Sequence, residues 1–414
     1  MRRFGFKETL AAALVLLSMA ACERENTATT REYREVIIYC GMGYNNLSSN
    51  IRSNLEQLKE GNLPYDTADK AIVAFCHNTA PGGGYTTDNP PVLLQFCNRG
   101  GQNVIDTLRI YPADTKSATA ESLTAALFDI RGLFPAKRYG MIFSSHSTGW
   151  TPCGYKAAEE GEFAFSATQE REAEEFPLTK AFGSQFVGSY ERNMEIDLTD
   201  FAAAIPMKLE YIIFDSCLMG GVEVAWELKN VCDRIVFSPT EVIAEGFIYK
   251  PMPWHLLAGR NPDLKSICED FFNYYDSQSG NSRSATVTLL DCRGLDRLAE
   301  VFSGIVASHR EGFDNINRGK VQPYFYGAGS STKDWFYDIR DAAREAGADS
   351  GELSMLDKAL DGCIEYHAET ESFFKTPLER CCGLSSYLPS PSRPRLTAYY
   401  KGLSWNRAVG LVAE

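Results

Sequence analysis

The chain has 414 residues, of which 44% are hydrophobic, 23% charged and 12% aromatic. This globular composition excludes collagen-like, low-complexity and wholly disordered chains, and the length suits about two or three domains or one large α/β domain with additions. The formal net charge of −13 argues against general nucleic-acid binding, which depends on Lys and Arg neutralising phosphate. We therefore expect no nucleic-acid partner.

The first 22 residues have the order of an export signal rather than of a folded segment. A positive start at Arg2, Arg3 and Lys7 precedes an apolar run over 10–19 and then Ala20-Ala21-Cys22. The apolar run is too short for a comfortable membrane span.

The end of this segment resembles a bacterial lipobox, in which Cys22 would become the lipidated first residue of the mature protein. An ordinary secretory signal with a chance cysteine is the alternative. No other stretch approaches 18 apolar residues, so membrane attachment has to come from the lipid anchor, with 23–34 as a polar tether. We expect a bacterial cell-envelope lipoprotein, whose mature net charge becomes −15 because residues 1–22 carry three positive charges and Glu8.

Eleven further cysteines remain after Cys22. Export would permit disulfides, but five of these cysteines lie in apolar runs and are expected to be small buried hydrophobes. These are Cys40, Cys76, Cys97, Cys232 and Cys292. The adjacent pair Cys381-Cys382 suits neither a common disulfide nor zinc, and we expect no metal site. Cys217 alone stands out by its local sequence.

Apolar strand-like runs alternate with helical patterns along the chain. The predicted strands are 35–40, 71–76, 91–97, 106–111, 139–143, 209–214 and 234–237, and the predicted helices are 46–60, 120–133 and 221–232. This alternation indicates an α/β fold with a mostly parallel sheet covered on both faces.

Two parts of the chain depart from this alternation of strands and helices. Residues 154–195 are rich in Glu, Gly, Ser and Thr and predict a long acidic surface loop. From 263 to 414 we expect an α/β extension, either a second lobe or a continuation of the same sheet. Its predicted helices are 267–275, 295–308 and 353–367, and its strand-like runs are 285–290 and 382–388.

Two predicted strands end in chemically reactive loops. One continues into Ser144-Ser145-His146, and the other into Asp215-Ser216-Cys217. Ligands bind beyond the carboxyl ends of parallel strands, so a His and a Cys at the same edge can meet although they are distant in sequence. A thiolate is a nucleophile, and a nearby imidazole can transfer its proton.

Taken singly, a His is more often structural and a Cys more often part of a core. The loop position favours a functional role for these two. The other His residues are weaker candidates for the reactive imidazole. His77 lacks a Gly-rich neighbourhood, and the expected helical segments contain His255, His309 and His367.

In chain order, these segments resemble the clostripain-like cysteine peptidases, which belong to one clan with caspases, gingipains and legumains. The loops over 143–150 and 214–221 carry the resemblance, together with further segments. Those are 37–47 (Ile-Ile-Tyr-Cys-Gly-Met-Gly-Tyr-Asn-Asn-Leu), 178–183, 194–198, 222–228, 237–241 and 246–249. The resemblance extends over about residues 36–255; the ordered set is specific, whereas each motif alone would be weak.

The resemblance implies a caspase-like α/β/α sandwich over 35–262 and a cysteine endopeptidase that acts on proteins or peptides. Cys217 would be the nucleophile and His146 the general acid and base, with no third catalytic carboxylate and no required cofactor. Backbone N–H groups of Cys217 and of Ser147 or Thr148 would form the oxyanion hole. We expect a monomer.

Members generally cleave after Arg or Lys, which requires a shielded carboxylate in the specificity pocket. Asp215 matches the family's acidic position, although a strand-end Asp can instead cap the following helix. Glu245 is the next candidate for substrate binding, with Glu241 behind it.

The sequence departs from the family pattern at two places. Ser147 stands where a Gly often follows the catalytic His, and the loop over 239–249 is poorer in Gly and acidic residues than is usual in the family, which weakens the expectation of basic specificity. Members are often zymogens cut between the His and Cys strands. The 154–195 loop offers cleavage positions for such activation at Lys156, Arg171, Lys180 and Arg192.

Some members respond to calcium, and the Glu run at 170–175 could bind it weakly, but a solvated acidic loop is the better interpretation. Close His pairs for a metallopeptidase and a G-x-S-x-G pentapeptide for a serine hydrolase do not occur. The main alternative is a catalytically inactive surface lipoprotein that uses the same fold to bind peptide or glycan partners.

Overall fold

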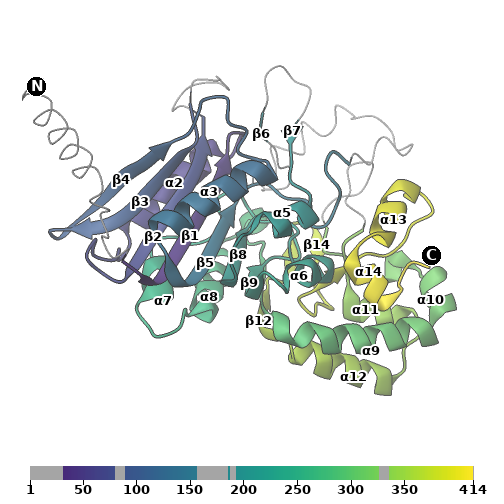
Figure 1. Ribbon diagram of the computed structural model, residues 1–414. Coiled ribbons are helices and arrows are strands. Elements are labelled where there is room, and N and C mark those ends of the chain that lie inside the picture. Colours follow the sequence, from purple (N-terminus) through teal and green to yellow (C-terminus); the bar gives the residue numbers. More distant parts are fainter. Residues whose placement is uncertain (1–30, 80–88, 156–184, 187–192, 326–334, 414) are drawn as a thin grey trace, which may run out of the picture. The chain divides into compact units, whose positions relative to one another are not determined.

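A nine-stranded mixed sheet forms the centre of the computed structural model (Figure 1). The structure describes residues 31–79, 89–155, 185–186, 193–325 and 335–413. The sheet has the order β12-β10-β9-β8-β5-β1-β2-β3-β4. In chain order its strands are β1 (Tyr33–Gly43), β2 (Lys70–Asn78), β3 (Val92–Arg99), β4 (Gln102–Ile110), β5 (Ala136–Ser144), β8 (Leu209–Asp215), β9 (Cys232–Phe237), β10 (Thr286–Asp291) and β12 (Ile364–Glu369).

The five central strands, β9, β8, β5, β1 and β2, are parallel, and the strands at both edges are antiparallel. Strands such as β1 and β8 are apolar along almost their whole length and buried on both faces, as expected for parallel strands between two helical layers. The predicted α/β fold with a parallel sheet centre is therefore confirmed.

Helices cover the two faces of the sheet. Those of eight or more residues are α2 (Ser48–Glu60), α3 (Ala120–Leu133), α8 (Leu264–Asp276), α9 (Leu295–Ser308), α12 (Ser350–Asp361) and α13 (Pro394–Lys401). The shorter ones are α5 (Leu198–Ala204), α6 (Val222–Leu228), α7 (Met252–Leu257), α10 (Arg310–Asp314), α11 (Ile339–Glu345) and α14 (Ser404–Val409), and there are 3-10 turns at 280–282, 292–294 and 318–320. One layer runs through α3, α5, α6, α14, α9 and α12, each contacting the next.

The alternation of side chains along β5 and β8 assigns these layers to faces. Phe143 and Phe214 lie side by side on one face, where both rings contact Phe201 of α5. The next residues, Ser144 and Asp215, point to the opposite face. That face is covered by α2 and by the segment around Tyr249, whose ring contacts Tyr39 of β1.

The C-terminal extension continues the central sheet rather than forming a separate lobe, because β10 and β12 are two of its strands. Three two-stranded sheets complete the described fold: β6 (Gln185–Phe186) with β7 (Asn193–Met194), β11 (Tyr337–Asp338) with β15 (Ser385–Ser386), and β13 (Ser372–Phe373) with β14 (Thr376–Pro377). β15 also bridges to Gly221, four residues after Cys217, so the extension reaches the Cys loop.

Several predicted boundaries are wrong. β1 begins at Tyr33, inside the predicted tether, and the helix expected over 221–232 ends at Leu228. The helix expected over 353–367 ends at Asp361, and His367 lies on β12 instead. Of the strand expected over 382–388, only β15 is paired.

The five cysteines expected in the core are indeed buried. Between Cys40 and Cys382, every cysteine of the described residues is a free thiol. In the part of the chain that the structure describes, no helix is long and apolar enough to cross a membrane. Cys22 and residues 1–30, and most of the predicted acidic loop, lie outside the described residues.

Candidate active site

His146 and Cys217 follow two neighbouring parallel strands at equivalent positions. Ser144 at the end of β5 pairs in register with Asp215 at the end of β8, and each candidate lies two residues further on. The parallel register therefore brings both loops to the same edge of the sheet, as the sequence predicted.

Direct contacts join the two loops. The Ser147 hydroxyl donates a hydrogen bond to the Cys217 carbonyl oxygen. Gly149 has a φ of +64°, and a Cβ on it would lie only 2.6 Å from the Leu218 carbonyl oxygen. Gly is needed at this point both for the left-handed backbone and for the close approach.

Ser147 accommodates its side chain without the backbone conformation that favours glycine. Among the described non-glycine residues, only Leu218 and Phe374 have a positive φ. A serine after His146 is therefore compatible with this loop, and its hydroxyl adds a link to the Cys loop that glycine would lack. Leu218, with φ of 60°, is the strained residue of the pair of loops.

The segment after β9 covers the Cys217 side chain, which is 0% exposed. The Val242 N–H donates to Cys217 Sγ at 3.0 Å. The Leu218 N–H donates to the Thr240 carbonyl at 2.9 Å, and the Gly220 N–H donates to the Ser238 carbonyl at 2.8 Å. A substrate carbonyl can reach the sulfur only if part of this covering segment shifts.

The His146 ring is 7% exposed and contacts a residue that the sequence analysis did not single out. Its Nε2 atom lies 2.6 Å from Oδ1 of Asn46. Asn46 belongs to the Asn-Asn-Leu turn after β1, which was noted only as part of a family motif. The sequence carries no signal for this contact, because the contact depends on β1 lying directly beside β5 in the sheet.

A small cleft with a cavity volume of about 80 Å³ lies next to the His loop. Residues 145–149 line it together with an apolar wall from the α5 face of the sheet. That wall includes Phe143, Phe214, Leu198, Phe201 and Met219. The cleft thus offers an apolar surface beside the imidazole on the face opposite Asp215.

Asp215 is fully buried at the end of β8. Its Oδ2 atom accepts hydrogen bonds from Tyr249 Oη at 2.6 Å and Ser144 Oγ at 3.0 Å. Asp215 does not cap the following helix, because the N-cap of α6 is Gly221. The alternative interpretation of Asp215 as a helix cap is therefore wrong, and its role in a substrate pocket stays a prediction.

Glu245 is exposed and Glu241 half-exposed on the segment after β9. Burial raises the pKa of Tyr275 well above its usual range, and the negative charges of Asp215 and Glu245 raise it further. The Tyr275 hydroxyl donates to the Gly246 carbonyl at 2.9 Å. The negative charges of both predicted pocket carboxylates thus act on the same phenol.

The remaining His residues have structural contacts. His77 Nδ1 lies 2.7 Å from Ser117 Oγ, and burial lowers the pKa of His77 to about 4. His255 lies in α7, whereas His309 follows α9 and His367 pairs within the sheet.

Among the described residues, no group of three or more His, Cys, Asp or Glu side chains could hold a metal ion. The Glu run at 170–175 and all four predicted cleavage positions (Lys156, Arg171, Lys180 and Arg192) lie outside the described residues.

The C-terminal extension supports both the His loop and the Cys loop. Trp335 Nε1 donates to Thr151 Oγ1 at 3.2 Å on the His side, and the Phe336 ring packs within reach of Gly149. On the Cys side, the Ser385 N–H donates to the Gly220 carbonyl at 2.9 Å.

A family model described as the Clostripain family, peptidase C11, matches residues 40–311, which is more than half of the chain. The chain belongs to the Clostripain family. A comparison with curated proteins gives no match.

Solved structures of this peptidase type have the same fold as this clostripain-family chain. An inactive zymogen C11 protease from Parabacteroides distasonis is 23% identical, with a TM-score of 0.71 over 92% of this chain and 99% of that one. A secreted C11 cysteine protease from Bacteroides thetaiotaomicron is 24% identical, with a TM-score of 0.71 over 91% and 99% of the two chains. These likenesses bear out the predicted caspase-like α/β architecture. Family membership supports cysteine peptidase activity.

Proposed function

We propose that this protein is a cysteine endopeptidase that uses Cys217 as nucleophile and His146 as general acid and base. The observation that carries the proposal is the register of β5 and β8, which places the two residues at equivalent positions beyond adjacent strand ends. The link from Ser147 to the Cys217 carbonyl supports a fixed relation between the two loops.

In the proposed reaction, His146 takes the thiol proton and Cys217 Sγ forms a bond to the substrate carbonyl carbon. The C–N bond breaks as His146 returns the proton to the leaving amine, and water then hydrolyses the thioester with His146 as base. Backbone N–H groups of Cys217 and Ser147 or Thr148 are the proposed oxyanion donors. Thiol and imidazole supply the chemistry, so the proposed reaction uses no cofactor.

We propose that Arg or Lys precedes the scissile bond and that Asp215 and Glu245 bind its cationic group. A carboxylate shielded from water pairs more strongly with a cation than an exposed one does, which favours Asp215 as the main partner. Their shared effect on Tyr275 supports a single region of negative charge.

The test of specificity compares kcat/KM for matched peptides with Arg or norleucine before the scissile bond. We expect Asp215→Asn to lower the Arg preference by about 100-fold or more and Glu245→Gln to lower it by about 10-fold, since each loses a charge partner. A thermal melt of each variant controls for folding, because Asp215 is hydrogen-bonded in the core. An unchanged Arg-to-norleucine ratio would discard the acidic pocket.

We further propose a monomeric, exported lipoprotein anchored through Cys22 in the cell envelope, with the 154–195 loop cut during activation. Cys22→Ser should move the protein from the membrane fraction to the soluble fraction of bacterial cells. Active wild-type protein that runs as one uncut band on a denaturing gel would contradict the activation step.

The catalytic proposal is tested with protein beginning at residue 23, wild type beside Cys217→Ala, and a fluorogenic peptide library varied before the scissile bond. We expect cleavage by wild type alone. Equal cleavage by both would exclude Cys217 as the nucleophile.

The full burial of Cys217 favours one alternative, a catalytically inactive member that binds peptide or glycan partners. This alternative predicts no cleavage by either protein, with or without calcium, even after a limited tryptic cut in the 154–195 loop.

A further inference from the structure

The contact between His146 and Asn46 has a direction that bears on proton transfer. A carboxamide oxygen only accepts hydrogen bonds. With Asn46 Oδ1 at 2.6 Å from His146 Nε2, the ring has to carry a hydrogen on Nε2. A neutral imidazole has only one N–H, so its lone pair is then on Nδ1.

The turn that presents Asn46 is held by the neighbouring asparagine rather than by Asn46 itself. Buried Asn45 accepts the Leu47 N–H at 2.8 Å and donates to the Met42 carbonyl at 3.3 Å. Leu47 is the N-cap residue of α2. Asn45 therefore fixes the backbone, while the exposed Asn46 directs its amide to the imidazole.

The end of β1 is also fixed relative to the His loop. β1 pairs in parallel register with β5 up to Gly41 and Ser144. The Ser145 hydroxyl donates to the Met42 carbonyl at 3.1 Å. Three adjacent strands, β1, β5 and β8, thus bring Asn46, His146 and Cys217 to one edge of the sheet.

We propose that Asn46 is a positioning residue that holds His146 in the Nε2–H tautomer, so that Nδ1 is the atom that exchanges the proton with Cys217 and the leaving amine. This inference rests on the proposed peptidase function for its kinetic consequence, but the tautomer itself is a property of the resting protein. The hydrogen-bond partner on one ring nitrogen sets the state of the other.

The tautomer is tested without turnover, by ¹⁵N NMR of the Cys217→Ala protein labelled at histidine. The chain has five His, so a second sample carrying His146→Gln identifies the resonances that belong to His146. We expect a protonated Nε2 and an unprotonated Nδ1 at alkaline pH, and a mixture of tautomers after Asn46→Ala. A protonated Nδ1 overturns the proposal whether or not the protein is a peptidase.

The kinetic test compares Asn46→Ala and Asn46→Asp with Ser49→Ala, an exposed residue of the same helix start, as the matched control. We expect Asn46→Ala to lower kcat by about 10- to 100-fold, with KM and the melting temperature unchanged. Asn46→Asp keeps the acceptor and should restore most of kcat. Its negative charge favours the imidazolium, so the alkaline limb of the pH profile of kcat/KM should move upward.

If Asn46→Ala keeps the kcat and the pH profile of the wild type, the positioning role is overturned. Loss of kcat in Asn46→Asp equal to that in Asn46→Ala would show that Asn46 does not act as an acceptor, and would also overturn it. An inactive wild type with the expected NMR result would instead count against the proposed function and leave the tautomer assignment supported.

Discussion

At the scale of single residues, the close approach of the His loop and the Cys loop depends on Gly149. The Leu218 carbonyl occupies the space that a Cβ at this position would need. Leu218 itself has a left-handed backbone directly after Cys217. Such strain persists where surrounding contacts fix the conformation, and here its N–H is bound by the Thr240 carbonyl.

We expect Gly149→Ala to reduce both stability and activity. Gly154 also has a positive φ, of +68°, but a Cβ there would meet nothing within 4 Å, so Gly154→Ala measures the backbone cost alone, about 1–2 kcal/mol. Gly149→Ala adds the clash with Leu218, about 1–3 kcal/mol more, and moving the loops should lower kcat by about 100-fold. Urea unfolding and peptide hydrolysis measure the two effects; equal losses in both variants would contradict the close contact.

The His and Cys loops were predictable because each follows a buried apolar strand, a pattern that is local in sequence. Asn46 and Trp335 were not, because their contacts depend on which strands are neighbours and on how a segment almost two hundred positions away returns to the His loop. The order β8-β5-β1 has no signature in one sequence. The hydroxyl link of Ser147 likewise became visible only with the loops in place.

At the scale of elements, α6 is tied to the C-terminal extension through one buried carboxyl group. Glu223 accepts hydrogen bonds from the Tyr387 N–H and Tyr400 Oη, both at 2.9 Å, and from Ser386 Oγ at 3.1 Å. Burial nevertheless raises the pKa of Glu223 from 4.5 to about 6, because loss of water disfavours the charged form more than these donors favour it.

This carboxyl group should make folding weaker at neutral than at acidic pH. A raised pKa contributes stability below the unfolded-state value of 4.5, and that contribution is lost as pH rises through about 6. The shift corresponds to about 2 kcal/mol. We expect wild type to lose about that much free energy of unfolding relative to Glu223→Gln between pH 4.5 and 7.5. Urea titrations at both pH values measure it, and a pH-independent difference would contradict it.

Elements were predicted best where an apolar run fixed them. The helix over 120–133 has the predicted bounds, and β2 and β8 lie within two residues of theirs. The helix predicted over 353–367 is too long because tertiary contacts of its last residues override their helical pattern. The helix stops at Asp361, and the following residues pair with β10, where His367 Nδ1 lies 3.0 Å from Thr288 Oγ1.

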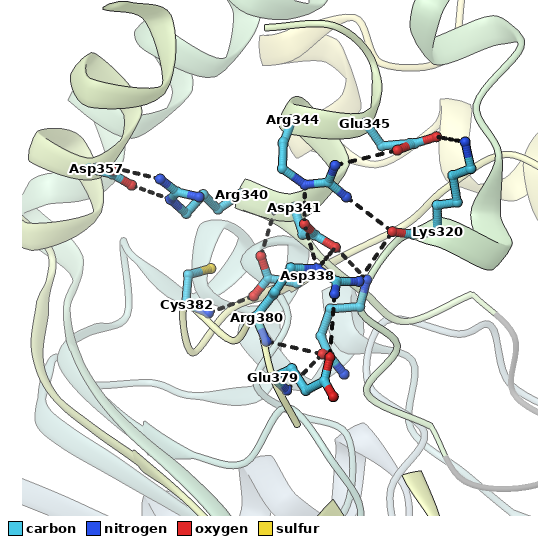
Figure 2. A network of polar contacts seen from close by, with 11 residues as sticks. Lys320, Asp338, Arg340, Asp341, Arg344, Glu345, Asp357, Glu379, Arg380 and Cys382 are labelled. Carbon is cyan, nitrogen blue, oxygen red and sulfur yellow. Dashed lines mark hydrogen bonds and ion pairs between the residues drawn. The ribbon is translucent and has the colours of Figure 1, made fainter. Parts of the chain in front are cut away.

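At the scale of the whole 33–413 unit, the extension is held together by a polar network, drawn in Figure 2. Buried Asp338 accepts from the Cys382 N–H at 2.6 Å and from Tyr324 Oη at 2.9 Å. β11, which contains Asp338, pairs with β15, and β15 bridges to Gly221. The network therefore stabilises the strand pair that supports the Cys loop.

Asp341 is the centre of this network and offers a direct measure of its strength. It is 2% exposed and accepts from the Gln322 N–H at 2.7 Å. It also accepts from Arg344 Nε at 2.6 Å and from Arg380 Nε at 3.0 Å (Figure 2). We expect Asp341→Ala to cost about 2–4 kcal/mol, because a buried N–H and two guanidinium groups lose their acceptor.

The matched control is Asp357→Ala, which removes the ion pair between Asp357 and Arg340 (Figure 2). Both side chains of this pair are about two-fifths exposed. Solvent screening and side-chain entropy limit the contribution of such an exposed ion pair to the free energy of unfolding to about 0–1 kcal/mol. Because β11 and β15 connect the network to Gly221, Asp341→Ala should also lower the temperature at which peptidase activity is lost, whereas Asp357→Ala should not. Equal unfolding free energies of the two variants would show that the network is a set of solvated surface pairs and not a support of the Cys loop.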